Sequence, residues 1–364
     1  MNVAVLCFHT LGGSGVVAGE LGRELARRGH EVHFISAALP GRLEPKPDGI
    51  FLHQVPLEAP PPLGAQAFPV LLAAQLTEVA RTRKIDLIHA HYALPHAAAA
   101  LLARAALGSA APPLLLTLHG SDVPEHAPEG MMMLLRRLAK EAAAITVPSA
   151  SLAARARDRL SQQQRFEVIP NFVDVERFSP GPARPSGKVL FHASNFRPVK
   201  RPVDLIRIFA RVRKEMKATL VLAGDGPERP RVEEEVRLLG LDGDVHFAGT
   251  PSDLLPLLRA ADLFLLPSAS ESFGLAALEA LACGVPVVGS RTGGLPEVVG
   301  DAGALREPGD VDAMALAAVR ILGDTAEHSR LRKLARDRAV QFFAAPPLLE
   351  RWEALYRRIL KENA

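Results

Sequence analysis

The feature that most constrains the fold is a regular alternation of short apolar runs with helical patterns along the 364-residue chain. Such alternation predicts βαβ units and parallel sheets. The strands expected in the first half lie near 2–8, 31–36, 85–90, 113–118, 144–148 and 166–169. Those expected in the second half lie at 189–193, 218–223, 244–247, 263–266 and 285–288. The predicted fold class is therefore α/β, with two Rossmann-like parallel-sheet domains facing a central cleft.

A Pro/Gly-rich connector at 179–187 separates the two series of strands. It cannot form a helix or a ladder, because proline lacks the N–H group that both require. We therefore expect an N-terminal domain at 1–178 and a C-terminal domain at 187–345. A hydrophobic content of 48% in 364 residues is enough for two separate cores. After the prolines at 346–347, an amphipathic helix is expected to end the chain.

Charge and cysteine content exclude several classes of function. The net charge of +3 is small and spread along the chain, which argues against a nucleic-acid partner. The two cysteines, Cys7 and Cys283, lie in apolar settings, which fits a reducing cytoplasm and argues against a disulfide framework or a metal cluster. We expect neither a signal peptide nor a membrane-spanning helix.

The most informative motif is a pair of carboxylates, Glu271 and Glu279, eight positions apart. Ser272 is expected to cap a helix between them, so the two carboxylates would lie on the order of 10 Å apart. The backbone N–H groups of Phe273, Gly274 and Leu275 would then face a diphosphate at the helix start. This spacing fits a sugar nucleotide, with sugar and ribose hydroxyls on the two carboxylates. The alternative is two solvated glutamates beside an ordinary helix.

Each predicted domain has a glycine turn that follows one of its strands. The first, at 12–15, precedes a helix that is expected to end at Gly29, and the second begins at Gly224. Glycines let backbone N–H groups approach an anion closely, and a helix start adds partial positive charge. Each turn could equally serve only tight packing between strand and helix.

Polar side chains also gather at strand ends. His119 precedes a glycine that leaves room for a ligand, which makes it a candidate for substrate contact or catalysis. His91 and His96 with His119 could suggest a metal, but no further carboxylate or thiolate lies at a ligand spacing, so we do not expect zinc. In the segment 194–201, Arg197 and Lys200 would place two cations where they could offset diphosphate charge. The alternative is a solvated basic turn.

These motifs resemble the retaining GT-B glycosyltransferases of family 4, and the resemblance covers nearly the whole chain. It is carried by E-x7-E at 271–279, G-G-S-G at 12–15, H-A-H-Y-A-L-P-H-A at 89–97, L-H-G-S-D at 118–122, N-F-V-D at 171–174, S-N-F-R-P-V-K-R at 194–201 and G-D-G-P-E at 224–228. Within the family it is similar to the branch that transfers GlcNAc from UDP-GlcNAc to the hydroxyl of L-malate, the first step of bacillithiol biosynthesis. One departure is Asn195, where many relatives carry arginine.

The resemblance implies a role for each candidate residue. His119, Arg197, Lys200 and Glu271 are the implied catalytic residues, with Glu279 on the ribose. The further donor-binding candidates are Gly15, Ser194, Asn195, Gly224, Phe273, Gly274 and Leu275. The acceptor candidates, expected at strand ends of the first domain, are Gly13, Ser14, Tyr92, Thr117, Arg137 and Asn171.

The resemblance also implies transfer with retention and without a metal or other cofactor, and a last helix, 346–364, that returns to the first domain. The expected partners are UDP-GlcNAc and L-malate, with a second copy of the chain as a further candidate and no membrane. Three alternatives stay open: a related glycosyltransferase acting on inositol phosphate, a lipid or a glycan, a UDP-GlcNAc epimerase, and a non-catalytic sugar-nucleotide sensor.

Overall fold

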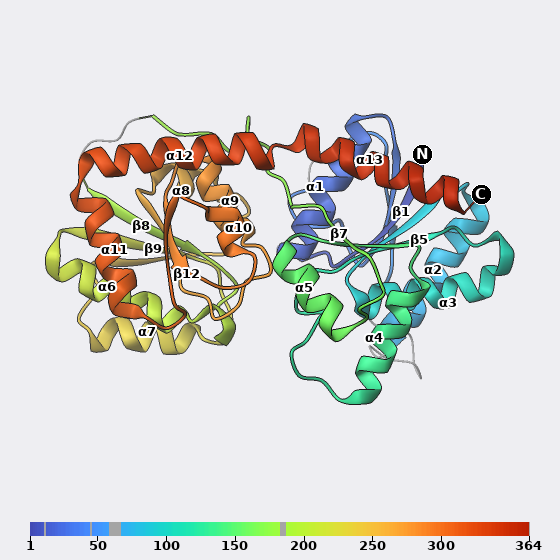
Figure 1. Ribbon diagram of the computed structural model, residues 1–364, viewed down its shortest axis with the longest axis horizontal. Coiled ribbons are helices and arrows are strands. Elements are labelled where there is room, and N and C mark those ends of the chain that lie inside the picture. Colours follow the sequence, from blue (N-terminus) through green and yellow to red (C-terminus); the bar gives the residue numbers. More distant parts are fainter. Residues whose placement is uncertain (11, 44–45, 58–66, 183–186, 364) are drawn as a thin grey trace. The chain divides into compact units, whose positions relative to one another are not determined.

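The computed structural model describes residues 1–10, 12–43, 46–57, 67–182 and 187–363, and it divides into two compact units (Figure 1). Unit 1 comprises Met1–Pro170 and Pro346–Ala364, and unit 2 comprises Asn171–Ala345.

The division between the units falls at 170/171 rather than in the expected connector. Residues 171–178 belong to unit 2 because they bond to its last long helix. The Val173 N–H donates to the Phe343 carbonyl at 2.9 Å, and the Arg336 guanidinium donates to the carbonyls of Val175 and Phe178. Residues 183–186 of the connector lie outside the described residues.

Unit 1 contains a seven-stranded parallel sheet in the order β3-β2-β1-β4-β5-β6-β7. Its strands are β1 (Asn2–Leu6), β2 (Glu31–Ser36), β3 (Ile50–Gln54), β4 (Leu87–His91), β5 (Leu114–Thr117), β6 (Ala144–Val147) and β7 (Phe166–Val168). Its helices are α1 (Gly13–Arg27), α2 (Phe68–Thr82), η2 (Ala93–Ala97), α3 (Ala98–Leu107), η3 (Gly108–Ala110), α4 (Glu129–Glu141), α5 (Ala150–Arg159) and α13 (Ala345–Glu362). Strand order reverses between β1 and β4, which is where open parallel sheets bind ligands.

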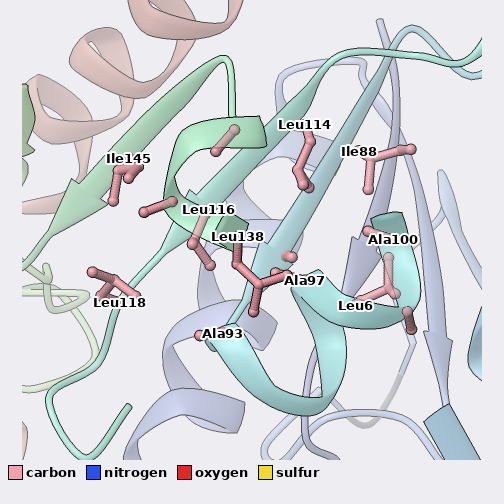
Figure 2. Close-up of a cluster of buried hydrophobic side chains, with 14 of the residues drawn as sticks. Leu6, Ile88, Ala93, Ala97, Ala100, Leu114, Leu116, Leu118, Leu138 and Ile145 are labelled. Atoms are coloured by element: carbon pink, nitrogen blue, oxygen red, sulfur yellow. The ribbon is translucent and has the colours of Figure 1, made fainter. Parts of the chain in front are cut away.

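Small side chains let the helices of unit 1 approach its sheet closely. Figure 2 shows Ala97 and Ala100, from η2 and α3, among leucines of the neighbouring strands, with Leu138 of α4 beside them. All three are buried in one hydrophobic cluster with Leu114 and Leu116 of β5. This core supports the strand ends that carry the polar residues of the unit.

The C-terminal helix α13 completes unit 1. Trp352 and Tyr356 are buried against the sheet, and the Tyr356 hydroxyl is 2.8 Å from Nδ1 of His89. Glu353 pairs with Arg28, at the end of α1, and with His30. The last helix therefore returns to the first unit.

Unit 2 contains a six-stranded parallel sheet in the order β10-β9-β8-β11-β12-β13. Its strands are β8 (Lys188–Ala193), β9 (Ala218–Ala223), β10 (Val245–Gly249), β11 (Leu263–Leu266), β12 (Val287–Ser290) and β13 (Gly303–Arg306). Its helices are η4 (Pro198–Lys200), α6 (Pro202–Glu215), α7 (Arg229–Leu238), α8 (Leu255–Ala260), α9 (Leu275–Ala282), α10 (Leu295–Val299), α11 (Val311–Gly323) and α12 (Thr325–Phe343). Here strand order reverses between β8 and β11.

Both faces of the unit 2 sheet are covered by helices (Figure 1). Successive residues of β8 are buried on opposite faces of the sheet. Leu190 belongs to the hydrophobic cluster on one face, and Phe191 belongs to the cluster on the other. Burial on both faces explains why these strands are nearly continuous apolar runs.

All the expected strands are present, and the α/β class with two parallel sheets is confirmed. Two strands were not expected, β3 and β13. Both are edge strands, and each buries a single residue, Ile50 in β3 and Leu305 in β13.

Candidate functional site

In unit 2, a lysine and a glutamate from two different loops form an ion pair where strand order reverses. The Lys200 ammonium donates to Oε1 of Glu271 at 2.6 Å, and the Ser268 hydroxyl donates to the same oxygen at 2.8 Å. Among the described residues, both side-chain hydrogen bonds to the Glu271 carboxylate are accepted by Oε1. Glu271 is 7% exposed and Lys200 is 22% exposed at the side chain. The second carboxylate oxygen can accept further hydrogen bonds, and the ammonium keeps two further N–H donors.

Backbone hydrogen bonds hold these loops in register. The Ala269 N–H donates to the Val199 carbonyl at 2.8 Å, which ties the loop after β11 to the loop after β8. The Gly294 N–H, after β12, donates to the Glu271 carbonyl at 2.9 Å. Sequence reasoning missed Ser268 and the loop after β12, although Ser268 lies three residues before Glu271.

Gly224 is required by close packing of two loop backbones. A Cβ atom at this position would lie 1.8 Å from the carbonyl oxygen of Ser194, and the φ angle is +120°. Ser194 is half-buried, whereas Asn195 and Arg197 are exposed. Packing alone therefore explains Gly224, whereas Arg197 is exposed.

Helix α9 begins later than expected. Gly274, not Ser272, is the N-cap, because its left-handed backbone (φ +99°) breaks the helix before Leu275. The first-turn amides are therefore those of 275–277, so Phe273 and Gly274 lie before the helix. Glu279 is buried little more than one turn into the helix, closer to its start than the two turns expected.

In unit 1, His119 lies in a cluster of aromatic and imidazole rings. Its Nε2 atom is 3.1 Å from Nδ1 of His91, and its ring stacks against Tyr92 with a centroid distance of 6.2 Å. Burial lowers the pKa of His119 to about 3, so the ring is neutral at physiological pH. Tyr92 has a positive φ of +95° and its hydroxyl bonds to that of Ser121. A neutral imidazole held in this way can donate or accept a single hydrogen bond to a ligand.

Asp122 organises the loop that carries His119. Its Oδ1 accepts from the backbone N–H groups of His119 (3.0 Å) and Gly120 (2.8 Å), and its Oδ2 accepts from that of Ala93 (3.3 Å). Burial raises the pKa of this carboxyl to about 6, although the three N–H donors oppose the shift. Sequence reasoning did not assign Asp122 a role. The available signal was an aspartate two residues after a glycine in a loop at a strand end.

The glycines of the loop after β1 differ in whether close packing requires them. A Cβ atom on Gly15 would lie 2.4 Å from the Thr10 carbonyl oxygen, so this glycine is needed for packing. Gly13 is exposed, and a Cβ atom there would meet no described atom within 4 Å. Ser14 lies beside it in the first turn of α1 and is half-buried. Gly13 and Ser14 are therefore open to a ligand, whereas Gly15 is not required for one.

Two acceptor candidates do not lie where they were expected, and a third, Thr117, ends β5 as expected but has a committed hydroxyl. Thr117 is buried, and its hydroxyl bonds to Nε2 of His89 (2.7 Å) and to the hydroxyl of Thr146 (2.6 Å). Arg137 is not at a strand end but on the exposed face of α4, paired with Glu141 at 2.5 Å. Asn171 is the first residue of unit 2. Arg137 was misplaced because 129–141 was not assigned as a helix, and Asn171 because the unit boundary precedes the connector.

In the described ranges, no group of three or more His, Cys, Asp or Glu side chains could hold a metal ion. None of the helices described is long and apolar enough to cross a membrane.

Comparisons with known proteins agree with this architecture. Residues 11–177 match the family described as Glycosyltransferase Family 4, and residues 187–324 match Glycosyl transferases group 1. A curated relative, N-acetyl-alpha-D-glucosaminyl L-malate synthase from Bacillus anthracis, is 35% identical over 100% of this chain and 98% of its own length. The chain belongs to glycosyltransferase family 4. It is thus a transferase, of the GT-B type.

Other relatives of this family 4 glycosyltransferase carry different names. A D-inositol 3-phosphate glycosyltransferase from Saccharomonospora viridis is 32% identical over 94% of this chain and 90% of its own length. Among solved structures, a sucrose-phosphate synthase from Thermosynechococcus elongatus has a TM-score of 0.84 and 24% identity, with 100% of both chains covered. HepE from Anabaena, in complex with UDP and glucose, has a TM-score of 0.83 and 23% identity, covering 98% and 99% of the chains. These two structures support the fold alone.

Proposed function

We propose that this glycosyltransferase moves GlcNAc from UDP-GlcNAc to the hydroxyl of L-malate, with retention at the anomeric carbon, giving GlcNAc-malate and UDP. The observation that carries the proposal is the 35% identity, over the full chain, to a relative that is named for this product. The inositol phosphate relatives also match at 32%, so the acceptor is the part of the proposal that most needs a test.

The donor is assigned to the loops of unit 2. Departure of UDP builds negative charge on the leaving phosphate and positive charge on the sugar ring, and fixed cations aimed at that phosphate lower the barrier. Lys200 is suited to this task because Glu271 already holds its ammonium in place. Arg197, on the same loop as Lys200, and the first-turn amides of α9 would add positive charge. We assign no metal to this step.

The two carboxylates of unit 2 are assigned to hydroxyl groups. Glu271 would accept hydrogen bonds from GlcNAc hydroxyls through its second oxygen, and Glu279 from the ribose. His119 of unit 1, held neutral by burial, would bind the sugar or the acceptor near the reacting carbon. In same-face attack, the malate hydroxyl forms the new bond to the anomeric carbon as the bond to UDP breaks, and its proton passes to the leaving phosphate.

The acceptor is assigned to the open part of the glycine loop in unit 1. Malate is a small dianion, so its site needs fixed hydrogen-bond donors more than apolar area. Gly13 and Ser14 lie at the start of α1, where backbone N–H groups and the helix dipole favour an anion. The Tyr92 hydroxyl is a further donor. A phosphate on an inositol would find the same donors, so this site by itself does not separate the two acceptors.

A UDP-release assay tests the proposal. UDP-GlcNAc is incubated with the enzyme alone, with L-malate, or with D-inositol 3-phosphate, and sugar products are separated by mass. Release that depends on malate, with one GlcNAc-malate formed per UDP, is the expected result. Release with inositol phosphate but not malate would overturn the acceptor while preserving the glycosyltransferase. Conversion of UDP-GlcNAc to another sugar without any acceptor would favour the epimerase.

A further inference from the structure

At the end of β8, a buried histidine is bonded on both ring nitrogens. His192 is 0% exposed. Its Nδ1 atom is 2.8 Å from the Leu265 carbonyl oxygen on the adjacent strand β11, and its Nε2 atom is 2.7 Å from the hydroxyl of Ser194. This pair of partners determines where the protons lie.

A carbonyl oxygen can only accept, so Nδ1 of His192 must carry a proton and donate it to Leu265. Burial, opposed by that hydrogen bond and assisted by the positive charge of Lys200, lowers the pKa of His192 to about 4. The ring is therefore neutral at physiological pH, and its Nε2 atom is a bare lone pair. Because that lone pair can only accept, the Ser194 hydroxyl must donate its single proton to it.

The backbone of Ser194 is committed in the same way. Its N–H donates to the Ala223 carbonyl at 3.1 Å, which extends the pairing of β8 with β9. Both protons that Ser194 could offer are thus used within unit 2, and its hydroxyl retains only acceptor capacity. A phosphate oxygen is itself an acceptor, so it gains no hydrogen bond from this residue.

We propose that Ser194 binds an O–H or N–H group of the nucleotide sugar and not its diphosphate, and that His192 is a positioning residue that sets the direction of the Ser194 hydroxyl. The proposal deepens the donor assignment and rests on the proposed function. Ser194 opens the loop that leads to Lys200, is half-buried, and is the residue against which the backbone of Gly224 packs. The Ser194 hydroxyl therefore acts toward the ligand as a hydrogen-bond acceptor.

Calorimetric titrations with UDP-GlcNAc, UDP and inorganic pyrophosphate test whether Ser194 binds an O–H or N–H group of the ligand or its diphosphate. Ser194→Ala should weaken UDP-GlcNAc binding about 3- to 10-fold, the effect of one lost hydrogen bond, and leave the affinity for inorganic pyrophosphate unchanged. The affinity for UDP then locates the bound group. If Ser194→Ala binds UDP more weakly by the same factor as UDP-GlcNAc, the group belongs to the nucleoside. If its affinity for UDP is unchanged, the group belongs to GlcNAc. Equal weakening with pyrophosphate, or no weakening with UDP-GlcNAc, would overturn the proposal.

Two substitutions of His192 test its positioning role. The amide of His192→Asn can occupy the place of Nδ1 and keep the bond to Leu265, but it leaves Ser194 without its acceptor. His192→Gln can place its carbonyl near Nε2 and keep Ser194 directed. His192→Asn should therefore weaken UDP-GlcNAc binding about 2- to 5-fold, whereas His192→Gln should keep the affinity within about twofold of wild type. Equal losses of affinity in His192→Asn and His192→Gln would refute the positioning role of His192.

A control and a fold check accompany these variants. His246→Asn changes an exposed histidine on the edge strand β10 and should bind as wild type does. Thermal melting confirms that each variant is folded. If wild-type protein does not bind UDP-GlcNAc, the proposed function itself fails, whereas wild-type binding with silent Ser194 and His192 variants refutes this inference alone.

Discussion

The Lys200 ammonium and the Glu271 carboxylate lie 2.6 Å apart although they are 71 positions apart in the sequence. Their loops meet because β8 and β11 are neighbours at the centre of the unit 2 sheet, where strand order reverses. An ion pair in this position holds a cation ready for an anionic ligand, since little side-chain entropy remains to be lost when the ligand binds.

Replacing the cation should slow the reaction more than it weakens donor binding. We expect Lys200→Met to lower kcat by roughly 100-fold or more, because the charge that it stabilises develops mainly in the transition state. Steady-state UDP release measures the effect, and Lys217→Met, at an exposed position before β9, is the matched control. A raised KM with unchanged kcat would show that Lys200 binds ground state and transition state equally.

Glu279 should contribute to nucleotide affinity. Glu279→Gln keeps the shape of the buried side chain but removes its charge, and we expect UDP binding to weaken by about 1.5–3 kcal/mol. Isothermal calorimetry with UDP measures the change. Glu234→Gln, at an exposed position on α7, is the control. Normal UDP affinity in Glu279→Gln would mean that the ribose is bound elsewhere.

Two glycines of one loop should respond oppositely to the same substitution. Gly15→Ala places a methyl group 2.4 Å from a backbone oxygen and should destabilise unit 1 by about 1–3 kcal/mol. Gly13→Ala meets no described atom within 4 Å, so it should leave the melting temperature unchanged and raise the KM for malate. Thermal melting and kinetics on both variants check this pair. A Gly13→Ala variant with normal malate KM would remove the acceptor from this loop.

Acid should destabilise unit 1 through its buried histidines. Burial lowers the pKa of His89 to about 3 and of His96 to about 4, whereas an unfolded histidine titrates near 6.5. Between these values the unfolded chain binds more protons, so the free energy of unfolding falls as pH drops from about 6.5 to about 4. Asp122, with a raised pKa of about 6, opposes this trend, because its protonation favours the folded state.

Denaturant titrations at several pH values test this trend, and the single tryptophan provides the signal. Trp352 is buried in α13, with its ring 5.3 Å from that of His89, so its fluorescence reports on unit 1. His96→Leu should reduce the slope of unfolding free energy against pH by about 1 kcal/mol per pH unit in this window. His126→Leu, at an exposed position, should leave the slope unchanged. Equal slopes in all three proteins would contradict the assignment.

The acceptor residues can be tested by kinetics alone. We expect Ser14→Ala and Tyr92→Phe to raise the KM for malate several-fold, since each removes a hydroxyl worth roughly 1 kcal/mol, while UDP affinity stays nearly unchanged. Varying each substrate in turn at saturation of the other makes the distinction. Weaker UDP binding in either variant would place that hydroxyl at the donor.

Much of the fold was predictable from local pattern. Fully buried parallel strands leave continuous apolar runs, so the central strands and the two-unit α/β plan followed from the sequence. The edge strands β3 and β13 did not, since each buries a single residue and leaves little apolar pattern. The start of α9 was also misplaced, since Ser272 and Gly274 are both acceptable caps and only the left-handed backbone of Gly274 separates them.

The sequence by itself determined which chemical groups stand at strand ends, and hence that cations, carboxylates and glycine turns would gather there. Only the tertiary structure decided which of them meet: Lys200 with Glu271, His119 with His91, and Thr117 with two buried partners rather than with solvent. The physical reason is that strand order and loop contacts depend on packing between residues far apart in the chain, and local periodicity carries no record of such contacts.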